Sequence, residues 1–247
     1  MTDKPIALIS GAAQGIGLAC ANALADDGYK VILADIKETV MAEAEQLDGA
    51  GYICDFSDVD AIKALFDMIE REHGPVSALV NNAGIAMPGD FLSYDLDAFD
   101  TVLGVNLRGV FVATQRAAQT MVAKGIEGAI VNMSSINAQV AIPAIPAYCA
   151  SKGGVMQLTK VAALALAKNN IRVNAVGPGS IDTEMMAGVN ANPDAFKTAM
   201  SRTPLGRPGG AKEIGDVVAF LCSSKASYVT GETIYVDGGR LGLNYTC

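Results

Sequence analysis

A tyrosine and a lysine four positions apart, Tyr148 and Lys152, are the residues in this chain best suited to chemistry. They lie near the expected start of a helix, so both side chains project from the same helix face. An ammonium group beside a phenol favours the phenolate and lowers the pKa of the tyrosine from its usual value of about 10. Tyr148 could then exchange a proton with a substrate hydroxyl near neutral pH. Ser135 ends an apolar strand segment at the same sheet edge, where its hydroxyl could hold the substrate oxygen.

A glycine-rich segment, residues 10–17, could hold a phosphate group. Gly11, Gly15 and Gly17 follow a first apolar strand and open a helix. Glycine lets the backbone turn tightly and approach a ligand, and a helix N-terminus offers free N–H groups and a positive dipole end to a pyrophosphate. The spacing is GxxxGxG rather than the commoner GxGxxG, and a plain turn is the alternative interpretation.

The residue that ends the second predicted strand indicates which dinucleotide would bind. Asp35 could accept hydrogen bonds from an adenosine ribose diol, and its charge would repel a 2′-phosphate. Ile36 follows it, so no arginine stands there, and Lys37 is the one nearby cation in the sequence. This pattern favours NAD over NADP. The alternative is that Asp35 caps the helix that follows.

Polar residues also follow the third and fourth predicted strands. Asp55 could bind an adenine amino group, and the turn over residues 81–84 could pack small groups near the adenosine ribose. Each could equally be an ordinary turn at a strand end.

The elements that must position these residues alternate between strand and helix along the whole chain. Short apolar runs predict strands, and longer runs with helical spacing predict helices. The expected strands are 5–9, 30–34, 50–54, 78–80, 129–133, 172–176 and 233–236, and the expected helices are 15–26, 38–47, 58–72, 96–124, 147–167 and 211–223. This order predicts one α/β domain over residues 1–247, a three-layer doubly wound parallel sheet of Rossmann type with about seven strands and ligands at the strands' carboxyl ends. Residues 183–208 are irregular and read as an insertion or substrate lid.

Composition excludes several classes of protein. The 247 residues are 51% hydrophobic and 18% charged, which excludes a disordered chain. The net charge of -8 without any lysine–arginine cluster argues against a nucleic-acid partner and an anionic membrane surface. We read no signal peptide and no membrane span. Five widely spaced cysteines without a CxxC, and a single histidine (His73), predict neither a disulfide framework nor a metal site. We therefore expect a reduced cytoplasmic enzyme.

Taken together and in this order, the motifs resemble those of the short-chain dehydrogenase/reductase family, and the resemblance covers essentially all 247 residues. It implies that Tyr148 is the catalytic acid/base, that Lys152 lowers its pKa and binds the nicotinamide ribose, and that Ser135 orients the substrate oxygen. It also implies that Asn106 holds a water that links Lys152 to solvent. Ser10 departs from the threonine of many relatives but keeps the hydroxyl. Such proteins are typically homotetramers, and residues 231–239 look like the last strand and the assembly surface.

The complete set of expected site residues follows from these motifs and the resemblance. The expected NAD contacts are Gly11, Gln14, Gly15, Ile16, Gly17, Asp35, Ile36, Asp55, Phe56, Asn82, Ala83, Gly84, Tyr148, Lys152, Pro178, Gly179, Ile181 and Thr183. The expected substrate contacts are Ser135, Asn137, Met185 and Met186, and no metal is expected.

Three functions compete at this point. The leading hypothesis is an NAD-dependent oxidoreductase for a small secondary alcohol such as a polyol, a sugar or a hydroxy acid. The first rival is a 3-oxoacyl thioester reductase, which usually goes with NADPH and a basic surface, and Asp35 and the acidic charge balance argue against it. The second is a non-catalytic dinucleotide sensor, which would need none of the proton-transfer residues.

Overall fold

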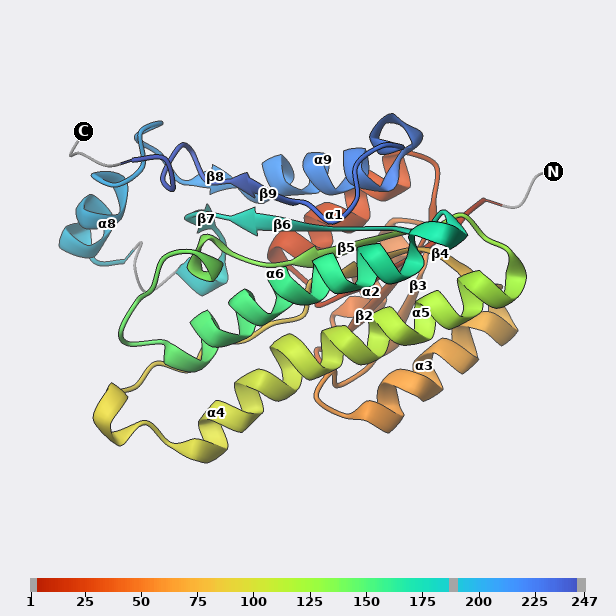
Figure 1. Cartoon of the computed structure of the whole chain (residues 1–247), viewed down its shortest axis with the longest axis horizontal. Coiled ribbons are helices and arrows are strands. Elements are labelled where there is room, and N and C mark those ends of the chain that lie inside the picture. Colours follow the sequence, from red (N-terminus) through yellow and green to blue (C-terminus); the bar gives the residue numbers. More distant parts are fainter. Residues whose placement is uncertain (1–3, 187–190, 244–247) are drawn as a thin grey trace.

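The computed structural model describes residues 4–186 and 191–243, and a seven-stranded parallel sheet forms its centre (Figure 1). The strand order is β3-β2-β1-β4-β5-β6-β9, so the chain reverses direction across the sheet between β1 and β4. The strands are β1 (Ile6–Ser10), β2 (Lys30–Asp35), β3 (Ala50–Ile53), β4 (Val76–Asn81), β5 (Ala129–Met133), β6 (Arg172–Pro178) and β9 (Thr233–Val236). Ligands of such sheets bind beyond the carboxyl ends of the strands near this reversal point.

Helices cover both faces of the sheet and give two apolar cores (Figure 1). Side chains alternate along a strand, so on β1 Ala7 and Ile9 enter one core and Ile6 and Leu8 enter the other. The first core packs against α1 (Gly15–Asp26), α2 (Val40–Gln46) and α9 (Ala211–Cys222), and the second against α3 (Val59–Glu72), α5 (Val110–Lys124) and α6 (Pro146–Leu166). The predicted three-layer doubly wound fold is confirmed.

The expected helix over residues 96–124 is interrupted. The structure has α4 (Leu96–Leu103), a π-helical segment η2 (Gly104–Gly109) and then α5. At Gly109 a Cβ atom would lie 2.2 Å from the Phe56 carbonyl oxygen, so the helix passes directly over the backbone that follows β3. Wide turns of this type often occur at functional sites, and this one contains Asn106.

The segment over residues 183–208 is partly ordered into regular structure. It contains η5 (Glu184–Met186) and α8 (Pro193–Met200), whereas residues 187–190 lie outside the described part of the chain. A two-stranded sheet of β7 (Ile181–Asp182) and β8 (Gly209–Gly210) joins the two ends of the segment. The helix was not predicted, although Asn192 caps it by accepting hydrogen bonds from the Asp194 and Ala195 amides. The remaining short turns are η1 (Phe91–Ser93), η3 (Ile136–Ala138), η4 (Ala167–Asn169) and η6 (Ser224–Ala226).

Two features are absent from the described residues, a membrane-spanning helix and a cluster of metal ligands. Neither residues 4–186 nor 191–243 contain a helix that is long and apolar enough to cross a membrane. The same ranges contain no group of three or more His, Cys, Asp or Glu side chains placed to hold a metal ion.

Candidate active site

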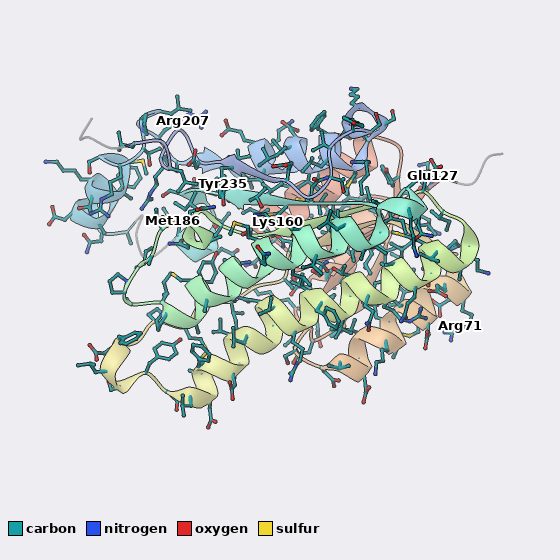
Figure 2. All side chains as sticks on the ribbon, viewed as in Figure 1. Arg71, Glu127, Lys160, Met186, Arg207 and Tyr235 are labelled. Atoms are coloured by element: carbon teal, nitrogen blue, oxygen red, sulfur yellow. The ribbon has the colours of Figure 1, made fainter. Side chains whose placement is uncertain are left out.

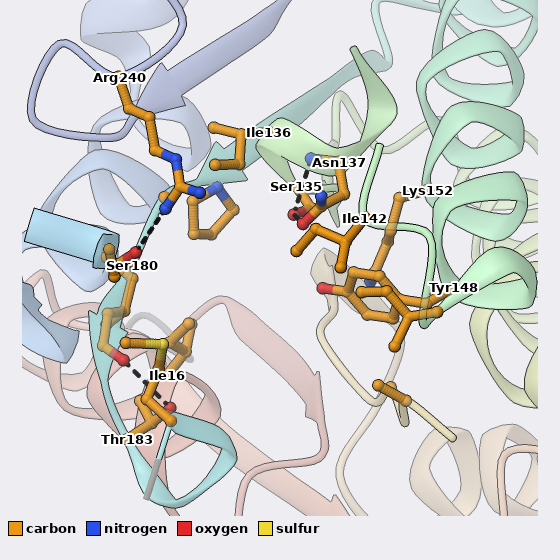
Figure 3. Close-up of a pocket in the computed structure, with 18 of the residues that line it drawn as sticks. Ile16, Ser135, Ile136, Asn137, Ile142, Tyr148, Lys152, Ser180, Thr183 and Arg240 are labelled. Carbon is orange, nitrogen blue, oxygen red and sulfur yellow. Dashed lines mark hydrogen bonds between the residues drawn. The ribbon is translucent and has the colours of Figure 1, made fainter. Parts of the chain in front are cut away.

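A cavity of about 760 Å³ opens at the carboxyl ends of β5 and β6, against α6 and α8 (Figure 3). It brings together side chains from parts of the chain that are far apart in sequence. The predicted site residues that line it are Ile16, Asn82, Gly84, Ser135, Asn137, Tyr148, Lys152, Pro178, Gly179, Ile181, Thr183 and Met186. The side chain of Met185, a predicted substrate contact, lies outside the described residues.

The glycine-rich loop is shaped by close contacts between backbone segments. Gly11 and Gly15 have positive φ angles of 64° and 57°, which favour glycine. A Cβ atom on Gly17 would lie 2.0 Å from the Gly11 carbonyl oxygen, and one on Gly11 would lie 2.8 Å from the Ala83 Cα. Gly15 is more open, because its nearest neighbour would be a Thr183 methyl group at 3.6 Å. Two of the three glycines therefore serve packing within the loop, and only Gly15 leaves space for a ligand.

The turn after β4 holds the glycine-rich loop in place. The Ser10 hydroxyl accepts hydrogen bonds from the amides of Asn82 and Ala83, both at 3.0 Å. In return, the Asn82 side-chain amide donates to the carbonyls of Ser10 at 3.1 Å and Gly11 at 2.9 Å. This network explains why a hydroxyl is needed at position 10 and gives Asn82 a positioning role.

The donors and acceptors around this loop fit a dinucleotide. α1 begins at Gly15, and its N-cap Gln14 makes no side-chain capping hydrogen bond, so no side chain competes for the first amides of the helix. Asp35 ends β2 and is only 8% exposed, with its carboxylate accepting from the amides of Ala13 and Lys37 at 3.0 Å each. The following helix, α2, has Thr39 as its N-cap, so Asp35 does not cap it. Helix amides suit a pyrophosphate, and the partly free carboxylate suits a ribose diol.

The other residues expected at the adenine end differ in their exposure to solvent. Asp55 is exposed, and its carboxylate accepts from the Ser57 amide at 2.8 Å. Ile36 is 65% exposed. The Phe56 ring is buried in the second core, and its expected contact with NAD stays a prediction. Any contact of Phe56 with a ligand would have to come from its backbone.

The Tyr148–Lys152 pair lies on one face of α6, as its spacing predicts. The Lys152 ammonium lies 5.4 Å from the centre of the Tyr148 ring and donates a 2.7 Å hydrogen bond to the Met133 carbonyl. Burial lowers the pKa of Lys152 to about 8. Burial also raises the pKa of Tyr148, and the neighbouring Ser135 hydroxyl acts in the opposite direction.

The expected lowering of the Tyr148 pKa by Lys152 is therefore not found in this arrangement. The amine packs against the face of the phenol ring and donates to a carbonyl on β5, and desolvation outweighs the other influences on the phenol. In this arrangement burial therefore raises the pKa of Tyr148 and favours the neutral phenol over the phenolate.

The two consecutive serines after β5 have different partners. The Ser134 hydroxyl donates to the Lys152 carbonyl at 3.1 Å and ties α6 to the sheet. The Ser135 hydroxyl lies on the cavity side with Tyr148, accepts from the Asn137 amide at 3.1 Å and donates to the Asn137 side chain at 3.3 Å (Figure 3). Ser135 is thus the serine placed to meet a substrate oxygen, and Asn137 orients it.

Asn106 is fully buried, and its side-chain amide is engaged by protein groups. It accepts from the Ile85 amide at 2.8 Å and donates to the Ile85 carbonyl at 2.9 Å and to the Ser151 hydroxyl at 3.1 Å. Ser151 in turn donates to the Tyr148 carbonyl at 2.7 Å. Asn106 therefore connects the turn after β4 to the helix that carries Tyr148. Its expected role in holding a water stays a prediction.

Two arginines that the sequence interpretation did not single out also line the cavity, Arg202 and Arg240. Arg240 directly follows the Gly238–Gly239 pair at the end of a segment that the resemblance had marked as an assembly surface. The sequence signal that could have indicated this site is the position of the Arg240 cation directly after two glycines.

Comparison with known proteins identifies the family of the chain. A family model described as enoyl-(acyl carrier protein) reductase matches residues 11–240. Among curated proteins, the 3-oxoacyl-[acyl-carrier-protein] reductase of Thermotoga maritima is 41% identical and is aligned over 96% of this chain and 98% of its own length. The cis-4-hydroxycyclohexanecarboxylate dehydrogenase of Sinomonas cyclohexanicum is 40% identical over 95% of both chains.

The chain belongs to the short-chain dehydrogenase/reductase family. As a family member it is an oxidoreductase. A solved gluconate 5-dehydrogenase from Burkholderia cenocepacia, in complex with NADP and tartrate, superposes with a TM-score of 0.93 at 32% identity and covers 98% of this chain and 96% of that chain. The predicted family is confirmed, and the match supports a nicotinamide dinucleotide as the cofactor of this short-chain dehydrogenase/reductase.

Proposed function

We propose that this protein is an NAD-dependent oxidoreductase that interconverts a small secondary alcohol and its ketone. The observation that carries the proposal is the convergence of Ser135, Tyr148 and Lys152 on one cavity at the carboxyl edge of the sheet. The glycine-rich loop and Asp35 lie along the same edge, where a dinucleotide would be held.

Each side chain in the cavity would have a separate role in the reaction. NAD, when bound, supplies the hydride acceptor at C4 of its nicotinamide. Ser135 holds the substrate oxygen, and Tyr148 takes the hydroxyl proton during oxidation and returns it during reduction. Lys152, whose ammonium donates to the Met133 carbonyl and packs on the Tyr148 ring, would bind the nicotinamide ribose. Pro178, Gly179, Ile181 and Thr183 would contact the nicotinamide end.

The rival acyl thioester reductase is weighed against the same residues. The curated relatives include such a reductase and an alcohol dehydrogenase at nearly equal identity, 41% and 40%, so similarity alone does not rank them. Asp35 disfavours NADPH, and a net charge of -8 disfavours an acidic carrier protein. The retained Ser135, Tyr148 and Lys152 disfavour a non-catalytic sensor.

A substrate panel tests this proposal. We expect NAD reduction, followed by absorbance at 340 nm, with at least one member of a panel of secondary alcohols, polyols, sugars and hydroxy acids. The comparison reaction is the reduction of a 3-oxoacyl thioester with NADPH or NADH. Robust thioester reduction without oxidation of any panel alcohol would establish the rival activity instead.

We further propose a cytoplasmic homotetramer. A dihedral tetramer needs two different self-complementary surfaces, and two features of the chain support this proposal. One is the edge strand β9, which pairs only with β6 among the described strands. The other is an apolar face on α5 and α6, where exposed apolar side chains surround a groove of about 510 Å³. Phe111, Val122 and Val161 line the groove, and Leu164 is exposed beside it, three residues after Val161 on α6. The four described cysteines are free thiols, which suits a reducing compartment, and cell fractionation would test that location.

Leu164→Asp should separate the tetramer into smaller species. The side chain is 82% exposed in the single chain, and a carboxylate there would be buried against a second copy at a cost of several kcal/mol. Sedimentation velocity measures the result. Leu92→Asp, at a leucine that is 95% exposed on η1 rather than on this face, is the matched control. A tetramer that persists in Leu164→Asp would place the interface elsewhere.

A further inference from the structure

The wall of the active-site cavity opposite the reactive groups carries two cations. Arg240 follows β9, and Arg202 follows α8, and both line the cavity with Tyr148 and Ser135. Figure 3 shows the Arg240 guanidinium across the open space from Tyr148 and Ser135, with Ser180 beside it. Arg240 is partly buried and donates a 2.9 Å hydrogen bond to the Ser180 hydroxyl, which fixes the direction of its guanidinium.

These two guanidiniums lack carboxylate partners in the described part of the chain. Arg116 and Arg207, by contrast, each form an ion pair. The carboxylate closest in sequence to Arg240 is Asp237, which accepts hydrogen bonds from the amides that follow it, those of residues 239 and 241, at 2.9 and 2.7 Å. Asp194 does line the cavity, where it lies exposed in the first turn of α8.

The two arginines on this wall favour the binding of an anionic ligand. Burial lowers the pKa of Arg240, the charge of Arg202 lowers it further, and Asp237 opposes both. Arg240 is half-buried and Arg202 is exposed, and two neighbouring cations repel each other until an anion lies between them. A guanidinium presents two parallel N–H groups whose geometry matches a carboxylate, which makes the pair both strong and directional.

We propose that Arg240, assisted by Arg202, binds a carboxylate group of the substrate, so that the alcohol oxidised at Tyr148 belongs to a hydroxy acid. This inference rests on the proposed function, since it places the reactive hydroxyl at Ser135 and Tyr148. The carboxylate lies at the Arg240 end and the carbon to be oxidised at the Tyr148 end. Ile136, Ile142 and Met186 on the walls between them suit the carbon skeleton of such a molecule.

The test compares acids with neutral counterparts that carry a hydroxymethyl group in place of the carboxylate. The pairs are D-gluconate with D-glucitol, L-tartrate with L-threitol, and cis-4-hydroxycyclohexanecarboxylate with cis-4-(hydroxymethyl)cyclohexanol. Calorimetric titration of the NADH-saturated enzyme measures binding, and NAD reduction measures turnover. We expect at least one acid to bind at least tenfold more tightly than its neutral counterpart, and Arg240→Gln to weaken that acid by about 10- to 100-fold.

A control variant and a cofactor measurement exclude general effects of charge. Arg207→Gln removes the same charge five residues after Arg202, and Figure 2 shows that Arg71 lies at the opposite end of the molecule from Arg207. Arg207 pairs with Glu213 and does not line the cavity, so its variant should bind the acid as the wild type does. The Kd of NADH should be unchanged in Arg240→Gln. A weaker NADH affinity without any change for the acid would show that Arg240 binds the cofactor and would overturn the inference.

The outcomes separate this inference from the proposed function. Oxidation of neutral alcohols with no preference for acids, or binding of none of the three acids, would overturn the carboxylate site and leave the dehydrogenase intact. Tight, Arg240-dependent binding of an acid with no NAD reduction on the whole panel would keep the carboxylate site and overturn the dehydrogenase. Equal affinities for an acid in wild type and Arg240→Gln would also overturn the site. Tighter binding of 6-phosphogluconate than of gluconate, lost in Arg240→Gln, would show a phosphate site instead.

Discussion

Replacement of Tyr148 by phenylalanine should lower kcat by about 10²- to 10⁴-fold, the usual contribution of one positioned proton donor or acceptor. The substitution removes only the phenolic oxygen, so the ring and its 5.4 Å contact with the Lys152 ammonium remain. The affinity for NADH, measured by the fluorescence of the bound cofactor, should stay within about twofold of the wild type. A loss of kcat without a loss of cofactor binding is the result that a proton-transfer role requires.

The pH profile gives a second measurement on the same variant. Burial raises the pKa of Tyr148, so its phenol stays protonated up to a higher pH than an exposed tyrosine would. The phenolate that takes the alcohol proton therefore becomes abundant only as pH rises into the alkaline range. Oxidation by the wild type should therefore accelerate toward alkaline pH, and the residual rate of Tyr148→Phe should lose this dependence. Tyr52→Phe is the control. It also removes a phenolic hydroxyl, one that donates to Glu72, but Tyr52 does not line the cavity. Retained turnover in Tyr148→Phe would assign the proton to another group.

The fold was predictable because the strands are short apolar runs, and those inside the sheet are buried, whereas the edge strands β3 and β9 are more exposed. Residues 172–176 illustrate this, since they were expected as a strand and lie inside the buried β6, between β5 and β9. The π-helical turn in residues 104–109 was not predictable from apolar spacing, because it depends on how the Asn106 amide reaches the Ile85 backbone. The helix α8 did have a sequence signal, an Asn192 cap followed by proline, but we interpreted it only as part of an irregular insertion or substrate lid.

In the candidate site, too, some features were predictable from the sequence and others depended on the folded structure. Residue types and order were enough to identify Ser135, Tyr148 and Lys152, and all three line one cavity. The sign of the Tyr148 pKa shift was not predictable, because spacing gives the neighbours of a group and not the depth of its burial. The cations Arg202 and Arg240 were missed for a related reason. They come from segments 38 positions apart, and only the folded chain brings both to the cavity.

Cofactor preference should depend on one carboxylate. If Asp35 holds the adenosine ribose diol, Asp35→Ala removes charge-assisted hydrogen bonds worth about 1.5–3 kcal/mol and the repulsion of a 2′-phosphate together. The ratio of kcat/KM for NAD to that for NADP should fall by about 100-fold or more. Steady-state rates with both cofactors, on the best substrate of the panel, measure this ratio.

The structure also shows why alanine alone is an incomplete test. Asp35 accepts a 3.0 Å hydrogen bond from the Ala13 amide, so alanine releases the glycine-rich loop and weakens both cofactors. Asp35→Asn keeps an acceptor for that amide and removes only the charge, so it should admit NADP with a smaller loss of NAD affinity. Asp60→Asn is the control, because it removes the charge of an exposed carboxylate that pairs with Lys63 on α3 and does not line the cavity. If Asp35→Asn leaves the same preference as Asp60→Asn and the wild type, the discrimination between the cofactors does not come from the charge at the end of β2.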